Sequence, residues 1–316
     1  MRKLLAASFA LLVAFPVAAQ YPDKPVTMLA GYPPGGLVDV VARLVAEGMK
    51  ARFPKGLNVV NRPGAAGSVA VAEMARSPAD GYTIVMTPHS ALVIAPQLQE
   101  LAYRTPDDYD PVVNLVSYYP MIAVRSESEY RTMRDLIADA KANPGKLRVG
   151  SPGEGTSSHL NLEELMRLAD VKMVHVPFQG WAQSSPALLG GHIEALVAQP
   201  GELRGQVEGK RMRVLVNFKP ERMSTFADVP TAKELGWDVA NGVWYMFLAP
   251  KGTPAAVTRY VHDAAKAAIE DPKFAADMTN RGIDVDYRPG NALRSDLWRE
   301  YKVHAAILQR IGMLKK

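Results

Sequence analysis

The sequence predicts an α/β protein of two lobes, each formed by a mostly parallel β-sheet with helices on its faces. Three observations lead to this prediction. Short apolar segments alternate with amphipathic ones along the chain, which is typical of parallel sheets covered by helices. The 316 residues are more than one hydrophobic core usually organises. Two β-rich segments with aromatic residues, 113–124 and 239–249, are suited to lead the chain from one lobe to the other and back.

Lobe 1 is expected to contain residues 20–117 and residues 246–316. Its short apolar runs predict strands, and its apolar residues at helical spacing predict helices. Strands are expected at 26–30, 59–60 and 82–87. Helices are expected at 37–53, 69–76, 254–270 and 291–311. Ser68 is a suitable N-cap for the helix that follows it, because its hydroxyl can accept a hydrogen bond from a free backbone N–H group.

Residues 118–245 are expected to form lobe 2, where the alternation of strand, loop and helix begins again. Strands are expected at 147–150, 172–177, 192–197 and 212–216, in a second parallel sheet. Helices are expected at 160–168 and 182–189. The two crossover segments would then be the hinge strands between the lobes.

The first 19 residues have the features of a secretory signal. Arg2 and Lys3 precede an apolar stretch that ends on the small residues of Val17-Ala18-Ala19, so we expect cleavage after Ala19. A membrane anchor is the alternative, but it needs roughly 20 apolar residues, and this stretch is shorter and broken by Pro16. No later segment approaches that length, so stable insertion into a membrane is not expected.

The composition narrows the class of protein further. The chain has no cysteine, which removes disulfides, thiolate metal ligands, thiol nucleophiles and the lipid-bearing cysteine of a lipoprotein. An exported chain without an anchor is expected in the periplasm. The formal net charge of +5 includes the two basic residues of the signal and leaves only a weak basic excess. Nucleic-acid binders usually cluster basic charge more strongly, so we expect no nucleic-acid partner.

Three loops between a strand and a helix are candidates for an anion site. In parallel α/β sheets, ligands bind beyond the carboxyl ends of the strands, where helix N-termini offer free N–H groups. Gly35-Gly36 and residues 64–68 allow a close approach of the backbone to an anion. Residues 151–159 combine glycines with several hydroxyl groups at a helix start. Any one of these loops can be a simple tight turn, but three together favour an anion site.

Other kinds of site are poorly supported. Gly153-x-Gly155-x-x-Ser158 is close to a dinucleotide fingerprint, but the acidic residue expected on the next strand is replaced by Val176-Pro177-Phe178. We therefore expect no nucleotide and no other cofactor. No serine has a G-x-S-x-G elbow and no histidines have zinc-ligand spacing, so we expect neither catalytic nor metal-binding residues.

Two questions stay open at this stage. An exported serine hydrolase that uses Ser151 or Ser157 as its nucleophile is the rival interpretation, although no base and acid are recognisable. His175, inside an apolar strand, is expected to be structural. His89, which follows a strand, is a better candidate for a residue that faces the ligand.

The chain resembles the substrate-binding proteins of the tripartite tricarboxylate transporter family, the Bug proteins. The similar motifs follow one another along the whole chain after the signal. They include Pro34-Gly35-Gly36-x-x-Asp39, Asn61-Arg62-Pro63-Gly64-Ala65-x-Gly67-Ser68, Gly155-Thr156-Ser157-x-His159-Leu160 and His175-Val176-Pro177-Phe178-x-Gly180. The sequence departs from the family pattern at Pro33-Pro34, at 187–189 and at 199–206.

This resemblance implies a type II-like Venus-flytrap protein that delivers carboxylates to a membrane permease. It implies that residues 32–36 hold one carboxylate, that Asp39 braces this loop, and that residues 151–157 and 178–180 close from the other lobe. We expect a monomer that binds a dicarboxylate first and an aromatic carboxylate second; docking on a receptor kinase is a possible added role. The residues expected at the ligand are Tyr32, Pro34, Gly35, Gly36, Gly67, Ser68, His89, Ser90, Ser151, Gly155, Thr156, Ser157, Phe178, Gln179, Gly180 and Gln199.

Overall fold

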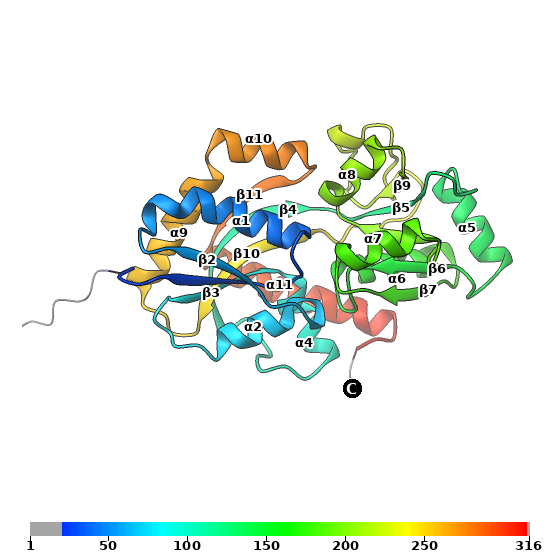
Figure 1. Ribbon diagram of the computed structural model, residues 1–316. Helices are drawn as coiled ribbons and strands as arrows, with labels where there is room; N and C mark the ends of the chain where they lie inside the picture. The colour runs from blue at the N-terminus through cyan, green and yellow to red at the C-terminus, as the bar shows by residue number, and fades with distance from the viewer. Residues whose placement is uncertain (1–20, 315–316) are drawn as a thin grey trace, which may run out of the picture.

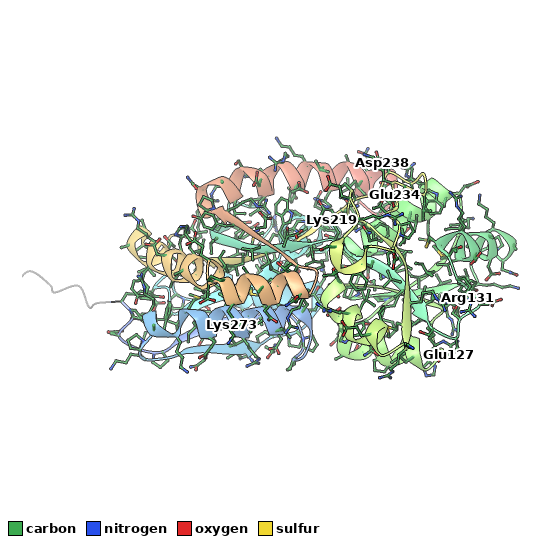
Figure 2. The ribbon with its side chains drawn as sticks, turned by 90° about the horizontal axis from the view of Figure 1, so that it is seen from above. Glu127, Arg131, Lys219, Glu234, Asp238 and Lys273 are labelled. Carbon is green, nitrogen blue, oxygen red and sulfur yellow. The ribbon has the colours of Figure 1, made fainter. Side chains whose placement is uncertain are left out.

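The computed structural model describes residues 21–314, which form two lobes, each around one β-sheet (Figure 1 and Figure 2). The signal expected at residues 1–19 lies outside the described residues. The sheet of lobe 1 has the strand order β11-β4-β10-β3-β1-β2, and the sheet of lobe 2 has the order β7-β6-β8-β5-β9. The predicted two-lobed α/β fold is confirmed.

The strands and helices are short and alternate through most of the chain. The strands of lobe 1 are β1 (Val26–Ala30), β2 (Leu57–Asn61), β3 (Thr83–Pro88), β4 (Tyr109–Tyr118), β10 (Val243–Pro250) and β11 (Asp284–Pro289). Its helices are α1 (Leu37–Met49), α2 (Ser68–Ala75), α3 (Ser90–Val93), α4 (Ala95–Leu98), α9 (Ala255–Ile269), α10 (Pro272–Asn280) and α11 (Gly290–Arg310). The strands of lobe 2 are β5 (Met121–Arg125), β6 (Arg148–Ser151), β7 (Val174–Pro177), β8 (Ala195–Ala198) and β9 (Met212–Asn217). Its helices are α5 (Met133–Ala142), α6 (Ser157–Ala169), α7 (Trp181–Leu189) and α8 (Pro200–Glu208).

Both sheets are mixed, whereas the sequence led us to expect mostly parallel ones. In lobe 1, β1 pairs with β2 and β3 in parallel, but β10 is antiparallel to β3 and β4, and β11 is antiparallel to β4. In lobe 2, β6 is parallel to β7 and β8, but β5 is antiparallel to β8 and β9. Parallel pairing requires a crossover connection, usually a helix. Because β10 and β5 enter their sheets from the other lobe, they can pair antiparallel.

The side chains of each sheet alternate between two apolar clusters, one on each face. In β1, Met28 and Ala30 pack with α1, α9 and α10, while Leu29 packs with α2, α3 and α11 on the other face. In lobe 2, Val197 of β8 packs with α5 and α6, and Leu196 packs with α7 and α8. This alternation follows from the two-residue period of a strand, and it leaves the strand ends and the helix starts to form the surface between the lobes.

The chain crosses between the lobes at two neighbouring places. It leaves lobe 1 where β4 ends at Tyr118, and it enters β5 at Met121 after Tyr119 and Pro120. It returns into β10 at Val243, which pairs with Tyr118. The sequence placed the crossings at 113–124 and 239–249; the action of these segments as hinges, and the exact lobe boundaries, stay predictions.

Within residues 21–314, no helix is both long enough and apolar enough to cross a membrane.

Candidate functional site

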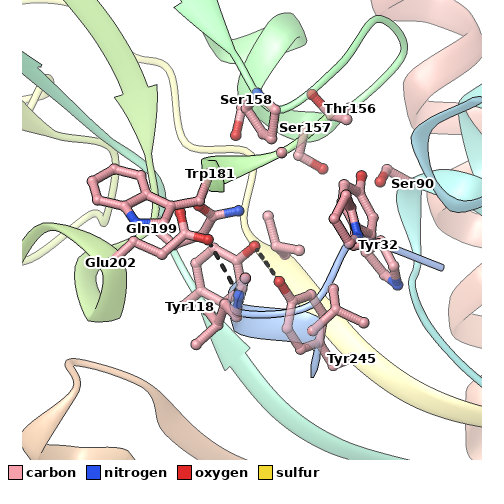
Figure 3. A pocket seen from close by; sticks show the side chains of 18 of the residues that line it. Tyr32, Ser90, Tyr118, Thr156, Ser157, Ser158, Trp181, Gln199, Glu202 and Tyr245 are labelled. Carbon is pink, nitrogen blue, oxygen red and sulfur yellow. Dashed lines mark hydrogen bonds between the residues drawn. The ribbon is translucent and has the colours of Figure 1, made fainter. Parts of the chain in front are cut away.

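A narrow pocket lies between the two lobes (Figure 3). Its lining includes residues from the first turns of four helices: α1 from lobe 1, and α6, α7 and α8 from lobe 2. The first N–H groups of a helix have no carbonyl partner within the helix, and they carry a partial positive charge. The pocket is therefore surrounded by groups that attract an anion.

The loop that leads into α1 is held in shape by Asp39. The backbone N–H of Gly35 donates to Oδ2 of Asp39 at 3.0 Å, while Arg43 and Asn61 donate to its Oδ1 at 2.9 and 3.0 Å. The amide of Asn61 also donates to the carbonyl oxygen of Tyr32 at 2.9 Å. Burial alone would raise the pKa of Asp39, but the hydrogen bonds from Arg43, Gly35 and Asn61 hold it below its ordinary value. Asp39 thus fixes both ends of residues 32–36.

The loop that leads into α6 presents a hydroxyl group without a partner. Thr156 is the N-cap of α6, and its Oγ1 accepts a hydrogen bond from the N–H of His159 at 3.2 Å. Ser157, the next residue, lines the pocket and is 1% exposed. Its Oγ has no hydrogen-bond partner among the described residues. A buried hydroxyl group without a partner is costly, so this atom is suited to bind a ligand.

Aromatic side chains form the floor and walls of the pocket. Tyr118 at the end of β4 and Tyr245 in β10 share a hydrogen bond of 2.9 Å between their hydroxyl oxygens, and their rings are 5.3 Å apart in an edge-to-face arrangement. Tyr32 of lobe 1 and Trp181 of lobe 2 line the pocket on either side (Figure 3). The lobes approach closely at Gly180, whose φ of 102° favours glycine and where a Cβ atom would lie a tight 3.3 Å from the ring of Tyr32.

Glu202 places a carboxyl group in the same pocket. It belongs to α8, and its Oε1 accepts a hydrogen bond of 3.2 Å from the N–H of Leu37, the first residue of α1. Burial between the lobes raises the pKa of Glu202 to about 8. No Lys, Arg or His of the described chain lines this pocket. An anionic ligand would therefore depend on backbone N–H groups and hydroxyl groups for its binding.

A second pocket, with an empty volume of about 930 Å³, opens beside the first between the same lobes. Tyr32 and Pro152 line both pockets. The glycine-rich turn at 64–67 and the segment 177–179 line the second pocket from opposite lobes. We regard it as the outer part of one cleft.

Comparison with known proteins identifies the family. Residues 41–313 match the tripartite tricarboxylate transporter family receptor. This chain belongs to that family. The receptor is 33% identical over 313 residues to the UPF0065 protein in the gbd 5′ region of Cupriavidus necator, covering 96% of this chain and 93% of its relative.

Two solved structures resemble this receptor closely in fold. The periplasmic binding protein BugD has a TM-score of 0.88 and 26% identity, over 94% of this chain and 100% of that chain. MatC from Rhodopseudomonas palustris, solved with bound malate, has a TM-score of 0.86 and 25% identity, over 91% of this chain and 100% of that chain. The family and its fold are thus established for this receptor.

The cleft of this receptor brings together most of the residues expected from the sequence. Those that line the inner pocket are Tyr32, Gly36, Ser90, Thr156, Ser157, Gly180 and Gln199. Those that line the outer pocket are Gly67, Phe178 and Gln179. Pro34, Gly35, Ser68, His89, Ser151 and Gly155 line neither pocket.

Ser68, Gly35 and Gly155 contribute to the backbone around the cleft. Ser68 does not cap α2, because Gly67 is the N-cap and Ser68 is the first residue of the helix. Gly35 and Gly155 have positive φ angles of 82° and 70°, which a residue with a side chain adopts only with strain. They shape the turns before α1 and α6.

Ser151 lies behind the cleft and is fully buried. Its Oγ bonds to Nε2 of His175 at 2.7 Å and accepts a hydrogen bond from the N–H of Gly153 at 3.2 Å. The ring of His175 stacks on His159, with centroids 3.8 Å apart. Burial, together with His159, lowers the pKa of His175 to about 3, so His175 is a weak base. This buried group braces the loop before α6, and it does not offer a nucleophile to the cleft.

His89 also faces away from the cleft, because its ring stacks on Trp244 at 4.8 Å. It approaches His304 and Glu300, and one nitrogen or oxygen atom of each side chain that could bind a metal ion lies within 4.8 Å of the other two. The N–H of Trp244 donates to Nδ1 of His89 at 3.2 Å, so the neutral ring carries its proton on Nε2. That nitrogen then has no lone pair for a metal ion. This arrangement suits a packed structural cluster.

Sequence reasoning missed several residues of the inner pocket. Tyr118, Val243 and Tyr245 were noticed only as parts of crossover segments, although both crossings pass beside the cleft. Glu202 lies three residues after Gln199, in a segment where the sequence departs from the family pattern. No helix was predicted at 200–208; Pro200, a residue typical of the first position of a helix, was the signal that could have placed Glu202 in a first helical turn.

Proposed function

We propose that this receptor captures a small carboxylate between its lobes in the periplasm and delivers it to the membrane permease subunits of a tripartite tricarboxylate-type transporter. The observation that carries the proposal is the convergence of four helix N-termini on a pocket that also contains the unpartnered hydroxyl group of Ser157. Such N-termini bind anions without any cationic side chain. The malate bound to MatC supports a carboxylate as the anion.

A dicarboxylate fits the arrangement of the anchors best. The N-terminus of α1 belongs to lobe 1, and that of α6, with Ser157, belongs to lobe 2. A ligand with two carboxylate groups can bind one anchor with each end and so favour the closed arrangement of the lobes. An aromatic carboxylate is the second choice, because Tyr32 and Trp181 offer flat apolar surfaces.

The geometry gives no support to the rival hydrolase. Of the two serines considered as nucleophiles, Ser157 lines the pocket, but its Oγ has no histidine or other base within hydrogen-bond distance among the described residues. Ser151 has a histidine partner but is buried away from the cleft. A nucleophile needs both access to the substrate and an adjacent base, and neither serine has the two together.

Two experiments test the proposal. Thermal-shift screening of the purified protein against mono-, di- and tricarboxylates, with the corresponding amides as controls, should give stabilisation by carboxylates alone, because a ligand that binds the native state raises its stability. Deletion of the gene should abolish uptake of the best carboxylate by cells, and the gene in trans should restore it. Stabilisation by amides as strong as by carboxylates would contradict the proposal, as would unchanged uptake.

A further inference from the structure

Glu202 reaches from lobe 2 into lobe 1. It lies in the first turn of α8, and Oε1 of its carboxyl group accepts the hydrogen bond of 3.2 Å from the N–H of Leu37 (Figure 3). This N–H belongs to the first residue of α1 and has no partner within its own helix. The N-cap residue Gly36 has no side chain to serve it. The carboxyl group of Glu202 thus occupies the place at α1 where a ligand carboxylate is proposed to bind.

The groups that face Glu202 do not neutralise it. Tyr32, Tyr118 from β4 and Tyr245 from β10 line the pocket with it (Figure 3). Two arginines in the neighbourhood have other partners: Arg204 on the same helix pairs with Glu208, and Arg281, which lies beside Gly201, pairs with Asp277. A second carboxylate at this position would therefore meet Glu202 without a cation between them.

We propose that Glu202 is an internal substitute for the ligand carboxylate, which bridges the lobes at the N-terminus of α1 until a ligand takes its place. This inference rests on the proposed function, because it takes the ligand to bind α1 through a carboxylate. Glu202 and the ligand compete for the N–H of Leu37, because both would accept its hydrogen bond. Since the pKa of Glu202 is raised to about 8, its carboxyl group is mostly protonated at pH 7, and the competition there is for the hydrogen bond and the space rather than between two charges.

The competition makes Glu202 a uniform penalty on carboxylate binding, so that only ligands with additional contacts bind tightly enough to be captured. It weakens the binding of every carboxylate by the same factor. A ligand that is held only at α1 exchanges one carboxylate contact for another and binds weakly. A ligand that also reaches Ser157 on α6 gains contacts that Glu202 does not make. The pocket thus selects ligands that bridge both lobes.

The first test needs no ligand. In the unliganded full-length mature protein, amide hydrogen exchange at Leu37 is compared between the wild type and Glu202→Ala, with Glu208→Ala on the exposed part of the same helix as the matched control. Loss of the bridge should raise the exchange rate of the Leu37 amide at least tenfold in Glu202→Ala, while Glu208→Ala leaves it unchanged. Equal exchange in all three proteins would overturn the proposal.

The second test measures competition. Titration calorimetry with malate, adipate and benzoate at pH 7 should show a dissociation constant roughly 2- to 12-fold lower for Glu202→Ala than for the wild type, because the hydrogen bond between Glu202 and Leu37 no longer has to be displaced. Glu202→Gln, which keeps the shape and an oxygen that can accept from Leu37, should bind like the wild type at pH 7. Unchanged or weaker binding by Glu202→Ala would overturn the proposal, since Glu202 would then serve the ligand. If no carboxylate binds either protein, the proposed function fails, and the exchange rates still decide whether Glu202 bridges the lobes.

Discussion

Replacing Ser157 by Ala should weaken ligand binding without weakening the fold. The Oγ of Ser157 is buried in the pocket and has no hydrogen-bond partner among the described residues, so the free protein loses no internal contact with it. The ligand complex does lose a hydrogen bond to a charged group. Such bonds contribute about 1.5–3 kcal/mol, which corresponds to a dissociation constant roughly 10–150 times higher.

Ser77→Ala is the matched control. Ser77 follows α2 in lobe 1, away from both pockets, and its Oγ donates to the carbonyl oxygen of Glu73 at 2.9 Å. Titration calorimetry with the tightest carboxylate should therefore give wild-type affinity for this variant and weakened affinity for Ser157→Ala. The melting temperature of free Ser157→Ala should equal or exceed that of the wild type. Equal dissociation constants for the two variants would remove Ser157 from the site and refute the reasoning.

Three further predictions follow from the same geometry. Asp39→Asn should lower the free energy of unfolding by about 1–3 kcal/mol at pH 7, because a hydrogen-bonded buried carboxylate is lost; urea denaturation measures this change. The pKa of Asp39 is lowered in the folded state, so its contribution to stability is present above its ordinary pKa. The difference between the variant and the wild type should therefore vanish as the pH falls well below about 4. Because the pKa of Glu202 is raised to about 8 in the folded state, its contribution to stability is complete at low pH and is lost as the pH rises from the ordinary pKa of a glutamate toward 8. The melting temperature of Glu202→Gln should lack this decline. Identical profiles of melting temperature against pH for the variant and the wild type would contradict the raised pKa of Glu202. Saturating carboxylate should reduce the radius of gyration in small-angle scattering by closing the lobes about the crossings at Tyr118–Met121 and before Val243, and an unchanged radius with confirmed binding would reject these hinges.

The alternation of strands and helices could be predicted well because the pattern of apolar residues within each short segment shows which of its residues are buried. Residues of β1 and β3 are mostly apolar, and α1 has most of its apolar residues on one face. Strand direction is not local in this way. A run such as that of β10 shows that it is buried, but whether it pairs parallel or antiparallel depends on where the chain enters the sheet, which for β10 is the other lobe.

The residues of the candidate site likewise divide into those whose position depends on neighbouring residues in the sequence and those whose position depends on distant ones. Glycines and hydroxyls before α1 and α6 could be recognised because the backbone geometry of a helix start depends on its own residues. The orientation of His89 could not, because it depends on a stacking partner, Trp244, 155 residues further along the chain. Glu202 looks like an ordinary surface glutamate in the sequence, and its partial burial arises only where the two lobes meet.

Titration calorimetry of malate against its diamide, malamide, tests the central claim most directly. The account predicts that one malate binds per chain, that malamide gives no measurable heat of binding, and that the malate recovered afterwards is chemically unchanged. If malate and the other mono-, di- and tricarboxylates all fail to bind, or if malamide binds as tightly as malate, the helix N-termini around this pocket do not form a carboxylate site and the account is wrong.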